Sequence, residues 1–444
     1  MLFKNIDSLI LNGQTPAIQQ KRRDTLDILS AAVDAVQPSH VVKNVFNGKK
    51  LEFSSESIDL SSFDNIYLVG FGKASIGMAQ GVCDAITIKK GVLITNNSSA
   101  IIRNSSIDVF RGGHPLPNDG SICGTEKIIN LLGQCSENDC IIILISGGGS
   151  SLLCKPRVSL DDLQATVDLL LRSGANIEEL NTIRKHLSFV KGGQLIQYTK
   201  AVIISLIISD IVHDPIHSIA SGPTSPDPST FSDVKEILTR YKLWTNIPIT
   251  VKKVIMEGID GRITETLKDK DSKFQDVFNF IIANNERACQ GALDKAKELG
   301  YRASLLTTSI SGEARGTGKR LINRLRKNFQ HNRTVVITSG ETTVTVQNNG
   351  TGGRNQELVL SCVEEISGTE IVFTSFATDG IDGNSDAAGA LADGFTLSRA
   401  LKKKLIPSYF LEQNNSNVFF KEINDALITG STGTNVMDIQ IFIR

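Results

Sequence analysis

Long apolar runs are missing from this chain of 444 residues. No segment approaches the roughly 20 consecutive apolar residues that a membrane-spanning helix needs. Residues 1–20 carry Lys4, Asp7 and Asn12 where a signal peptide would have its apolar core. We therefore expect a cytoplasmic protein that has no membrane partner.

An excess of charge of either sign is missing as well, because 47 Lys and Arg residues balance 47 Asp and Glu residues. A chain without net charge has no global field that attracts nucleic acid or an anionic membrane. A polyanionic ligand would have to be bound by a local group of cations. The composition thus predicts small-molecule partners and no nucleic acid.

Cysteine is scarce and scattered. The chain has seven, an odd number without a C-x-x-C pair: Cys83, Cys123, Cys135, Cys140, Cys154, Cys289 and Cys362. This pattern is not typical of a disulfide framework or a zinc site, and it predicts reduced, mostly buried thiols.

Several catalytic motifs are absent. The chain has no kinase H-R-D or D-F-G sequence, no G-x-S-x-G elbow and no H-E-x-x-H. Residues 312–320, G-E-A-R-G-T-G-K-R, do not fit the spacing of a P-loop. Residues 70–77, G-F-G-K-A-S-I-G, are close to the dinucleotide fingerprint, but Ser75 replaces its third glycine. The next predicted strand ends in Thr95 and Asn96 rather than in an acidic residue, which disfavours a nicotinamide enzyme.

What the chain does contain is an apolar run at residues 141–145, I-I-I-L-I, that stops abruptly in S-G-G-G-S-S. Such a run predicts a strand buried on both faces. Glycines let the backbone approach a ligand closely, and unpaired N–H groups at the start of a following helix attract anions. We expect this loop to bind an anion through six residues: Ser146, Gly147, Gly148, Gly149, Ser150 and Ser151.

Strands and helices alternate around this run. The patterns predict strands at 66–69, 91–95, 107–110, 141–145 and 202–208, and helices at 15–36, 76–86, 122–132, 160–171 and 177–190. Further strands are predicted at 277–283, 303–308, 334–338, 342–346, 371–377 and 438–443, and helices at 286–299 and 312–328. Alternation of this kind indicates an α/β fold with a mainly parallel sheet.

The length predicts two domains. Four of the 11 prolines fall between Pro215 and Pro228, which marks a functional loop or the approach to a boundary. We therefore expect one domain over residues 1–240 and a second over residues 241–444.

Two cations and a histidine stand beside glycines. Lys73 follows a predicted strand and a G-x-G sequence, and Arg354 follows Gly352 and Gly353. A guanidinium fork suits phosphate or carboxylate. His114, between Gly113 and Pro115, is either a ligand-binding residue or a loop histidine bonded to the backbone.

Three aspartates are candidates for a Mg²⁺ site. Asp210 and Asp379 each come shortly after a buried strand, and Asp386 is either a metal ligand or a helix cap. Glycine-rich loops, placed cations and carboxylates without a covalent nucleophile are what phosphoryl transfer requires, because its catalysis is positioning and charge neutralisation.

From about residue 21 to the C-terminus the chain resembles the class II glycerate kinases, whose C-terminal domain is called MOFRL. The motifs that carry the resemblance are G-K-A-S, G-H-P-L-P-N, I-S-G-G-G-S-S-L-L, L-N-T-I-R-K-H-L-S-F-V-K-G-G, S-D-I, I-A-S-G-P-T, S-G-E-T-T-V-T-V, G-G-R-N-Q-E, A-T-D-G-I-D-G and T-G-T-N-V-M-D. The resemblance implies a larger Rossmann-like N-terminal domain and a smaller α/β MOFRL domain, with the active site in the cleft between them. It also implies transfer of the γ-phosphate of ATP to D-glycerate with Mg²⁺, giving mostly 2-phosphoglycerate, by a monomer or homodimer.

The resemblance implies that Lys73 and Arg354 are the catalytic cations. It places substrate- or nucleotide-binding residues in the same motifs, at Gly72, Ser75, Asn181, Arg184, Lys185, Gly353, Asn355, Thr434 and Asn435 in addition to His114 and the 146–151 loop. His213 and Ser431 depart from the family pattern, where Gly and Pro are expected. Two other functions compete with this one: a non-catalytic nucleotide or sugar-phosphate sensor, and an NAD-dependent dehydrogenase.

Overall fold

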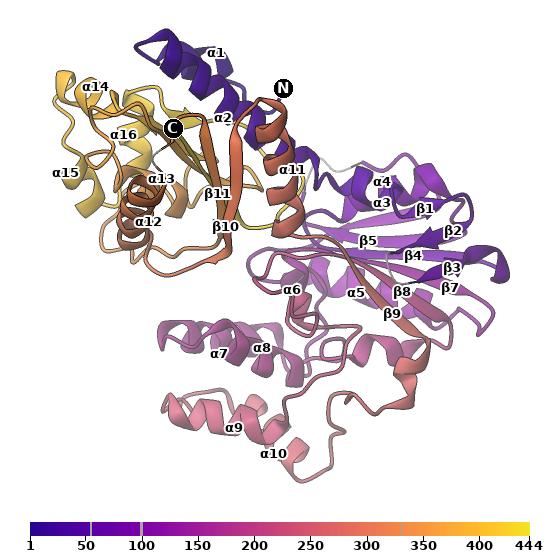
Figure 1. The fold of residues 1–444 in the computed structure, drawn as a ribbon. Helices are drawn as coiled ribbons and strands as arrows, with labels where there is room; N and C mark the ends of the chain where they lie inside the picture. The colour runs from indigo at the N-terminus through magenta and orange to yellow at the C-terminus, as the bar shows by residue number, and fades with distance from the viewer. Residues whose placement is uncertain (54–55, 98–100, 330) are drawn as a thin grey trace. The chain divides into compact units, whose positions relative to one another are not determined.

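A computed structural model describes residues 1–53, 56–97, 101–329 and 331–444. The chain forms two compact units (Figure 1). We call Pro38–Ile282 the central unit, and Met1–Gln37 together with Ala283–Arg444 the terminal unit. No helix in the described ranges is long and apolar enough to cross a membrane. All seven cysteines are free and five are buried, which agrees with the predicted reduced thiols.

The sheet of the central unit has the strand order β6-β5-β4-β7-β8-β9 (Figure 1). Its strands are β4 Ile66–Phe71, β5 Lys90–Thr95, β6 Ile107–Arg111, β7 Cys140–Ile145, β8 Val202–Ile208 and β9 Val277–Ala283. β4 pairs in parallel with both β5 and β7, and β5–β6 and β7–β8 are also parallel. Because the strand order reverses between β4 and β7, this is the doubly wound arrangement in which ligands bind outside the carboxyl ends of the strands at the reversal.

Helices cover both faces of this sheet. α3 (Pro38–Lys43) and α4 (Ser75–Ala85) lie on one face, and α5 (Asp119–Leu132) lies on the other (Figure 1). A small sheet of β1 (Phe46–Asn47), β2 (Lys50–Glu52) and β3 (Ser57–Asp59) completes this part. Four 3-10 helices occur among the described residues of the unit: Leu60–Ser62, Gln194–Tyr198, Ile219–Ser221 and Ser272–Asp276.

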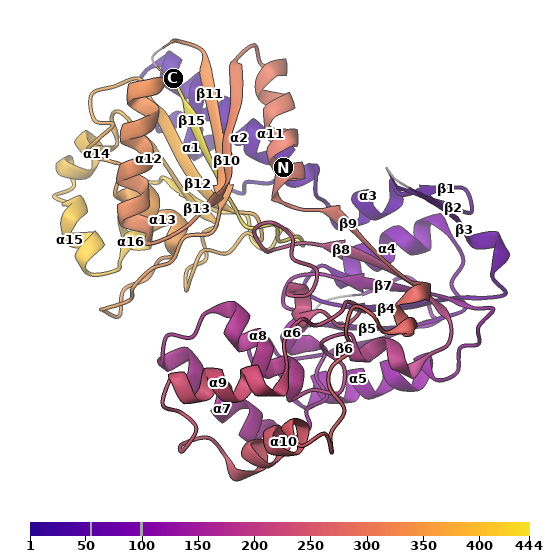
Figure 2. The same ribbon diagram turned by 60° about the horizontal axis from the view of Figure 1, so that its bottom comes forward.

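A group of helices beside the sheet has an apolar core of its own (Figure 2). It consists of α7 (Leu160–Arg172), α8 (Ile177–His186), α9 (Phe231–Arg240) and α10 (Ile249–Ile259). The sequence predicts the first two, although α8 ends at His186 rather than at residue 190, but it does not predict α9 or α10. The short α6 (Gly149–Leu152) follows β7 directly.

The terminal unit is built on a sheet with the order β10-β11-β15-β12-β13-β14. Only β10 and β11 are parallel among its paired strands; the other pairs are antiparallel. The strands are β10 Arg302–Ile310, β11 Thr334–Gly340, β12 Val372–Ala377, β13 Gly389–Asp393, β14 Ala426–Leu427 and β15 Asp438–Ile443. The helices are α1 Ile6–Leu11, α2 Pro16–Asp34, α11 Asn285–Glu298, α12 Ala314–Asn328, α13 Arg354–Leu360, α14 Thr396–Lys402, α15 Pro407–Glu412 and α16 Ser416–Glu422.

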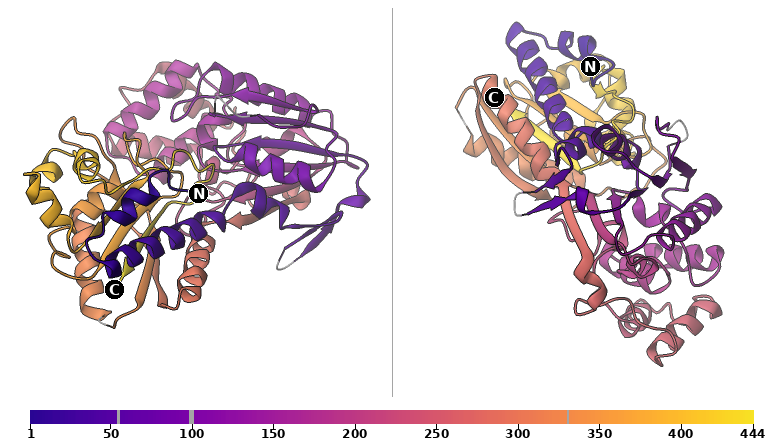
Figure 3. Two further views of the ribbon diagram at one scale, coloured as in Figure 1. Left: turned by 90° about the horizontal axis from the view of Figure 1, so that it is seen from above. Right: turned by 90° about the vertical axis from the view of Figure 1, so that its right-hand side faces the viewer.

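The first 37 residues belong to the terminal unit, whereas the sequence predicts that they belong to the N-terminal domain. α2 packs against α11 and the sheet, and the indigo N-terminal helices lie against the orange and yellow C-terminal elements (Figure 3). Arg22 of α2 is fully buried, and it donates 2.6 and 2.8 Å hydrogen bonds to Asp393 and Asp425. Both carboxylates also pair with Arg399, which makes a buried four-charge network.

The other boundary also differs from the predicted one at 240/241, because β9 is still part of the sheet of the central unit. The Pro-rich stretch at 215–228 is therefore a loop inside the central unit.

Most predicted elements are found close to their predicted bounds, and β8, β9 and β15 match them residue for residue. The predicted strand at 342–346 is wrong. Its backbone groups bond to the loop before α12 instead: Thr343 donates to the Gly312 carbonyl, and the N–H of Thr345 donates to the Glu313 carboxylate. The sequence patterns do not predict β13, β14 or α14–α16.

Candidate active site

The glycine loop follows β7 at the point where the strand order reverses. Ser146 is buried, and Gly148 has a φ of +81°, which an L side chain rarely adopts. The backbone N–H groups of Gly147 and Gly148 donate no hydrogen bond to any described residue. Two such N–H groups at a strand end have the arrangement of an anion-binding concavity, and anion binding here stays a prediction.

The loop after β4 is tied to this glycine loop. The Lys73 N–H donates to the Gly147 carbonyl at 2.9 Å, and the Ala74 N–H donates to Ser146 Oγ at 3.1 Å. Gly72, with a φ of +127°, allows the approach, because a Cβ there would lie only 2.1 Å from Ser146 Oγ. The two loops therefore have one fixed geometry relative to each other.

The side chains of Lys73 and His114 lie beside Gly148. A Cβ built on Gly148 would lie 3.4 Å from Lys73 Cγ, and 2.9 and 3.2 Å from His114 Cδ2 and Nε2. Ser151 Oγ donates a 2.5 Å bond to the Pro115 carbonyl, which holds the histidine loop against α6. A predicted cation and a predicted histidine are thus brought together at the predicted anion cradle.

Hydrogen bonds connect Ser150 of α6 to Ser221 and Asn181. Ser221 Oγ donates to Asn181 Oδ1 at 3.0 Å, so Ser150 Oγ is the donor in its 2.9 Å contact with Ser221. Ala220 and Ser221 have left-handed backbone angles, with φ of 51° and 61°, and such strain is typical of functional sites. Asn181 is buried and helps to position the loop, and its predicted contact with a ligand stays a prediction.

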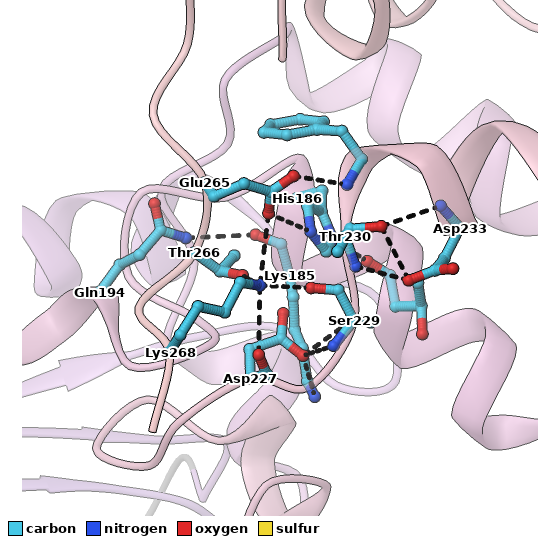
Figure 4. Close-up of polar contacts among 12 residues, drawn as sticks. Lys185, His186, Gln194, Asp227, Ser229, Thr230, Asp233, Glu265, Thr266 and Lys268 are labelled. Carbon is cyan, nitrogen blue, oxygen red and sulfur yellow. Dashed lines mark hydrogen bonds and ion pairs between the residues drawn. The ribbon is translucent and has the colours of Figure 1, made fainter. Parts of the chain in front are cut away.

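Two more predicted ligand residues have structural partners. Ser75 is fully buried and donates to the Gly72 carbonyl. Lys185 is buried and its Nζ lies 3.1 Å from Asp227 Oδ1, as Figure 4 shows. Around this pair His186 contacts Glu265, and Lys268 donates to the Asp227 carbonyl, so the network fastens α8 to the segment that precedes α9 (Figure 4). Ser75 and Lys185 thus each have a protein partner, and ligand binding by them stays a prediction.

Arg184 of α8, unlike Ser75 and Lys185, has no hydrogen-bond partner among the described residues. Its side chain lines a small cavity next to Ser150 and Ser151, and burial lowers its pKa. It makes no hydrogen bond or ion pair with any residue that the structure describes. An arginine in this situation is available to an anion.

In the terminal unit Arg354 already has carboxylate partners. Its Nε and one Nη donate to Asp438 at 2.5 and 3.0 Å, and the other Nη lies 2.6 Å from Glu341 Oε1. Burial lowers the pKa of the guanidinium, but the carboxylates of Asp438 and Glu341 outweigh it and raise the pKa above its usual value. Two of the five N–H groups remain for a ligand.

The other predicted residues of the terminal unit hold loops. Gly353 immediately precedes α13, and the buried Asn355 accepts from Ser375 Oγ. Asp382 accepts hydrogen bonds from the N–H groups of Asn355 and Gln356, which caps the helix. Asn355 therefore has protein partners, and its contact with a ligand stays a prediction.

The T-G-T-N segment before β15 is also held internally. Thr434 is buried and donates to the Val36 carbonyl at 3.1 Å, and Asn435 accepts from the Met437 N–H. Both side chains therefore help to shape the loop, and the ligand contacts that the resemblance implies stay predictions.

The three predicted metal ligands belong to both units. Asp210 belongs to the central unit, and Asp379 and Asp386 belong to the terminal unit. Asp386 is exposed and pairs with Lys421 at 2.8 Å, a contact that supports a surface ion pair rather than a metal ligand. The described residues contain no group of three His, Cys, Asp or Glu side chains that could hold a metal.

The two departures from the family pattern lie in loops. His213 has a φ of 64°, a left-handed conformation that explains why Gly is expected there. Ser431 is exposed. Sequence reasoning missed two residues near the site, Lys191 and Ser221, although both stand in quoted motifs: Lys191 in V-K-G-G and Ser221 in I-A-S-G-P-T.

Comparisons with known proteins agree with this architecture. Residues 24–256 match the domain of unknown function DUF4147, and residues 334–438 match the MOFRL family. The chain is 38% identical to the glycerate 2-kinase of Pyrococcus horikoshii and 36% identical to the D-glycerate 2-kinase of Thermotoga maritima. Each alignment covers 94% of this chain and 96% of the relative.

The fold is shared as well. The crystal structure of the glycerate kinase from Thermotoga maritima superimposes with a TM-score of 0.83 at 35% identity, covering 95% of this chain and 98% of that one. The chain therefore belongs to the glycerate kinase family whose members carry a MOFRL domain.

Proposed function

We propose that this chain is an ATP-dependent D-glycerate 2-kinase, which transfers the γ-phosphate of ATP to the 2-hydroxyl of D-glycerate and releases 2-phosphoglycerate and ADP. The observation that carries the proposal is the anion cradle at the strand-order reversal of the central unit. There the N–H groups of Gly147 and Gly148 lie beside the side chains of Lys73 and His114.

The cradle is suited to phosphoryl transfer because its donors are fixed before the reaction. The hydrogen bonds from Lys73 N–H to Gly147 and from Ala74 N–H to Ser146 join the two loops. Negative charge on the transferred group is spread over its oxygens in the transition state, so preorganised N–H groups and an ammonium stabilise it more than the ground state. His114, at the same loop, supplies a further hydrogen-bonding group for the phosphate or the acceptor.

We expect Mg²⁺ to bind together with ATP rather than at a site formed by the protein alone. Mg²⁺ in kinases keeps several waters and uses one or two protein carboxylates together with phosphate oxygens. Asp210 follows β8, the parallel neighbour of β7, so its carboxylate comes at the same edge of the sheet as the glycine loop. When bound, the ion would neutralise charge on the phosphates, with Asp210 or Asp379 as its protein ligand.

Arg354 remains a predicted catalytic cation. Its contacts with Asp438 and Glu341 support an orienting role for those carboxylates on the guanidinium, whose two remaining N–H groups are left for phosphate. Arg354→Ala should lower kcat, and Arg354→Lys should restore little, because an ammonium cannot make the two-pronged contact.

One assay tests the function. The purified chain is incubated with ATP, Mg²⁺ and a panel of small hydroxy acids, and ³¹P NMR identifies the phosphorylated carbon. We expect 2-phosphoglycerate from D-glycerate, and loss of turnover in excess EDTA. Nucleotide binding without turnover of any hydroxy acid would instead support a sensor, and NADH-dependent reduction would support a dehydrogenase.

A further inference from the structure

A small cavity in the central unit lies next to the glycine loop. It has a volume of about 30 Å³ and is bordered by residues of the 115–117 segment, α6, α7 and α8. Ser150 and Ser151 of α6 line it, and so do two cations, Arg184 and Lys191. The rest of its wall is mostly apolar, and no Asp or Glu is among the described residues that line it.

Neither cation has a counter-ion. Arg184 makes no hydrogen bond or ion pair with the described part of the chain. Lys191 is 3% exposed, and its Nζ donates to the Leu153 carbonyl at 2.5 Å, which uses one of its three N–H groups. Burial lowers the pKa of Lys191 to about 8, and the nearby Arg184 lowers it as well. Lys191 is buried and Arg184 is half-buried, and charges without partners in such surroundings are costly, so this pair is suited to binding an anion.

Neighbouring cations of the same region are satisfied, which makes the pair unusual. Lys185 has Asp227 as its partner. Arg157 donates to the Ser188 carbonyl and to Gln194, and its guanidinium stacks 4.4 Å from the centroid of the Phe189 ring. Lys155 pairs with Glu126. Of the cations in this region, Arg184 and Lys191 face the small cavity and have no carboxylate partner among the described residues.

We infer that Arg184 and Lys191 bind the carboxylate of the hydroxy-acid substrate, and that this contact determines which hydroxyl is phosphorylated. The inference rests on the proposed function and deepens it. The cavity has room for a carboxylate but not for a triphosphate, and its polar wall includes Ser150, which adjoins the anion cradle. In a 2-hydroxy acid the hydroxyl-bearing carbon is bonded directly to the carboxylate, so anchoring the carboxylate fixes the 2-hydroxyl more closely than the 3-hydroxyl.

The test compares binding of D-glycerate with binding of its methyl ester, which keeps both hydroxyls but has no charge. The variants are Arg184→Met and Lys191→Met. Lys155→Met is the control, because Lys155 directly follows Cys154 of the cavity wall but does not itself line the cavity. Calorimetry gives both dissociation constants, and steady-state kinetics gives the KM for ATP. Loss of a charge-assisted contact should weaken D-glycerate binding about ten- to a hundredfold in each cavity variant. Ester binding, the KM for ATP and the Lys155→Met variant should change little.

The outcomes separate the inference from the function on which it rests. If the wild-type chain neither binds nor phosphorylates D-glycerate, the proposed function itself is overturned. If the wild type is active but both variants keep the wild-type preference for the acid over the ester, the inference alone is overturned. A raised KM for ATP with unchanged D-glycerate binding would also overturn it, because the anion would then be a nucleotide phosphate. Arg184→Lys keeps the charge and should retain part of the preference for D-glycerate over its methyl ester. If Arg184→Met does not fold, a full wild-type preference or an unchanged ester affinity ratio in Arg184→Lys and Lys191→Met would overturn the inference.

Discussion

A single methyl group at Gly148 is the smallest change that probes the glycine loop. Gly148→Ala forces an L side chain into a φ of +81°, which costs about 1–2 kcal/mol of stability. The new Cβ would also lie 2.9 Å from His114 Cδ2, closer than ordinary van der Waals contact. Because His114 is exposed, its ring can move by a few tenths of an ångström to relieve this contact.

The chain supplies a matched control at Gly174. Its φ of +77° is nearly the same, but a Cβ there would meet no heavy atom within 4 Å. Gly174→Ala should therefore lose about the same 1–2 kcal/mol of unfolding free energy, measured by urea denaturation, and keep full activity. Gly148→Ala should in addition lose about ten- to a hundredfold in kcat/KM for ATP, since small displacements of catalytic groups have effects of this size.

The two variants together decide whether the loop is a site. If Gly148→Ala and Gly174→Ala have the same stability and the same kinetic constants as each other, the loop is a plain turn. The anion cradle would then have to be abandoned, whatever the activity of the wild-type chain.

Three further predictions concern charges. Arg22→Met should lower the free energy of unfolding, measured by urea titration, by about 3–5 kcal/mol, because it leaves Asp393 and Asp425 buried with only Arg399. Arg23→Met, on the exposed side of the same helix, should change it by less than about 0.5 kcal/mol. Equal effects of the two substitutions would contradict the buried network. Asp386→Asn should leave kcat and the Mg²⁺ dependence of the rate unchanged, since this exposed carboxylate pairs with Lys421, and a large rise in the Mg²⁺ requirement would restore it as a metal ligand. An anion binds the charged form of Lys191, whose pKa is about 8 in the free protein, so the dissociation constant of D-glycerate should rise as the pH increases above 8. Cys154 and Arg184 are the other titratable groups beside Lys191. The rise should be absent in Lys191→Met.

The strands and the cradle could be predicted because their signals are local. Residues 141–145 are uniformly apolar, and the loop that follows has glycines at the positions that need a left-handed or close-approaching backbone. Lys73 could be placed at the same edge, because parallel strands end on one side of their sheet.

The domain boundary could not be predicted, because it depends on contacts between distant residues. Arg22 contacts Asp393 and Asp425, which lie about 400 residues away in the sequence, and no local sequence pattern predicts a buried arginine. The strand predicted at 342–346 fails for a related reason, since its alternating Thr and Val residues bond to the segment around Glu313 rather than to a strand.

Motif membership also does not predict which residues have protein partners in the fold. Lys185, Asn355 and Thr434 stand in the motifs that resemble the family, yet each side chain is buried with a protein partner. A sequence motif does not distinguish a residue that touches the ligand from one that holds the loop in shape. Only the packing of the folded chain makes that distinction.

The most direct test of the phosphate-handling site is a single-turnover measurement on Lys73→Ala. With enzyme in excess over radiolabelled ATP and with saturating D-glycerate, the rate of label transfer reports the chemical step alone. Removal of one preorganised donor should lower that rate about 10²- to 10³-fold while the dissociation constant of ATP changes much less. A transfer rate equal to that of the wild type would contradict the proposed role of Lys73, because Lys73 would then lie next to the glycine loop without stabilising the transferred phosphoryl group.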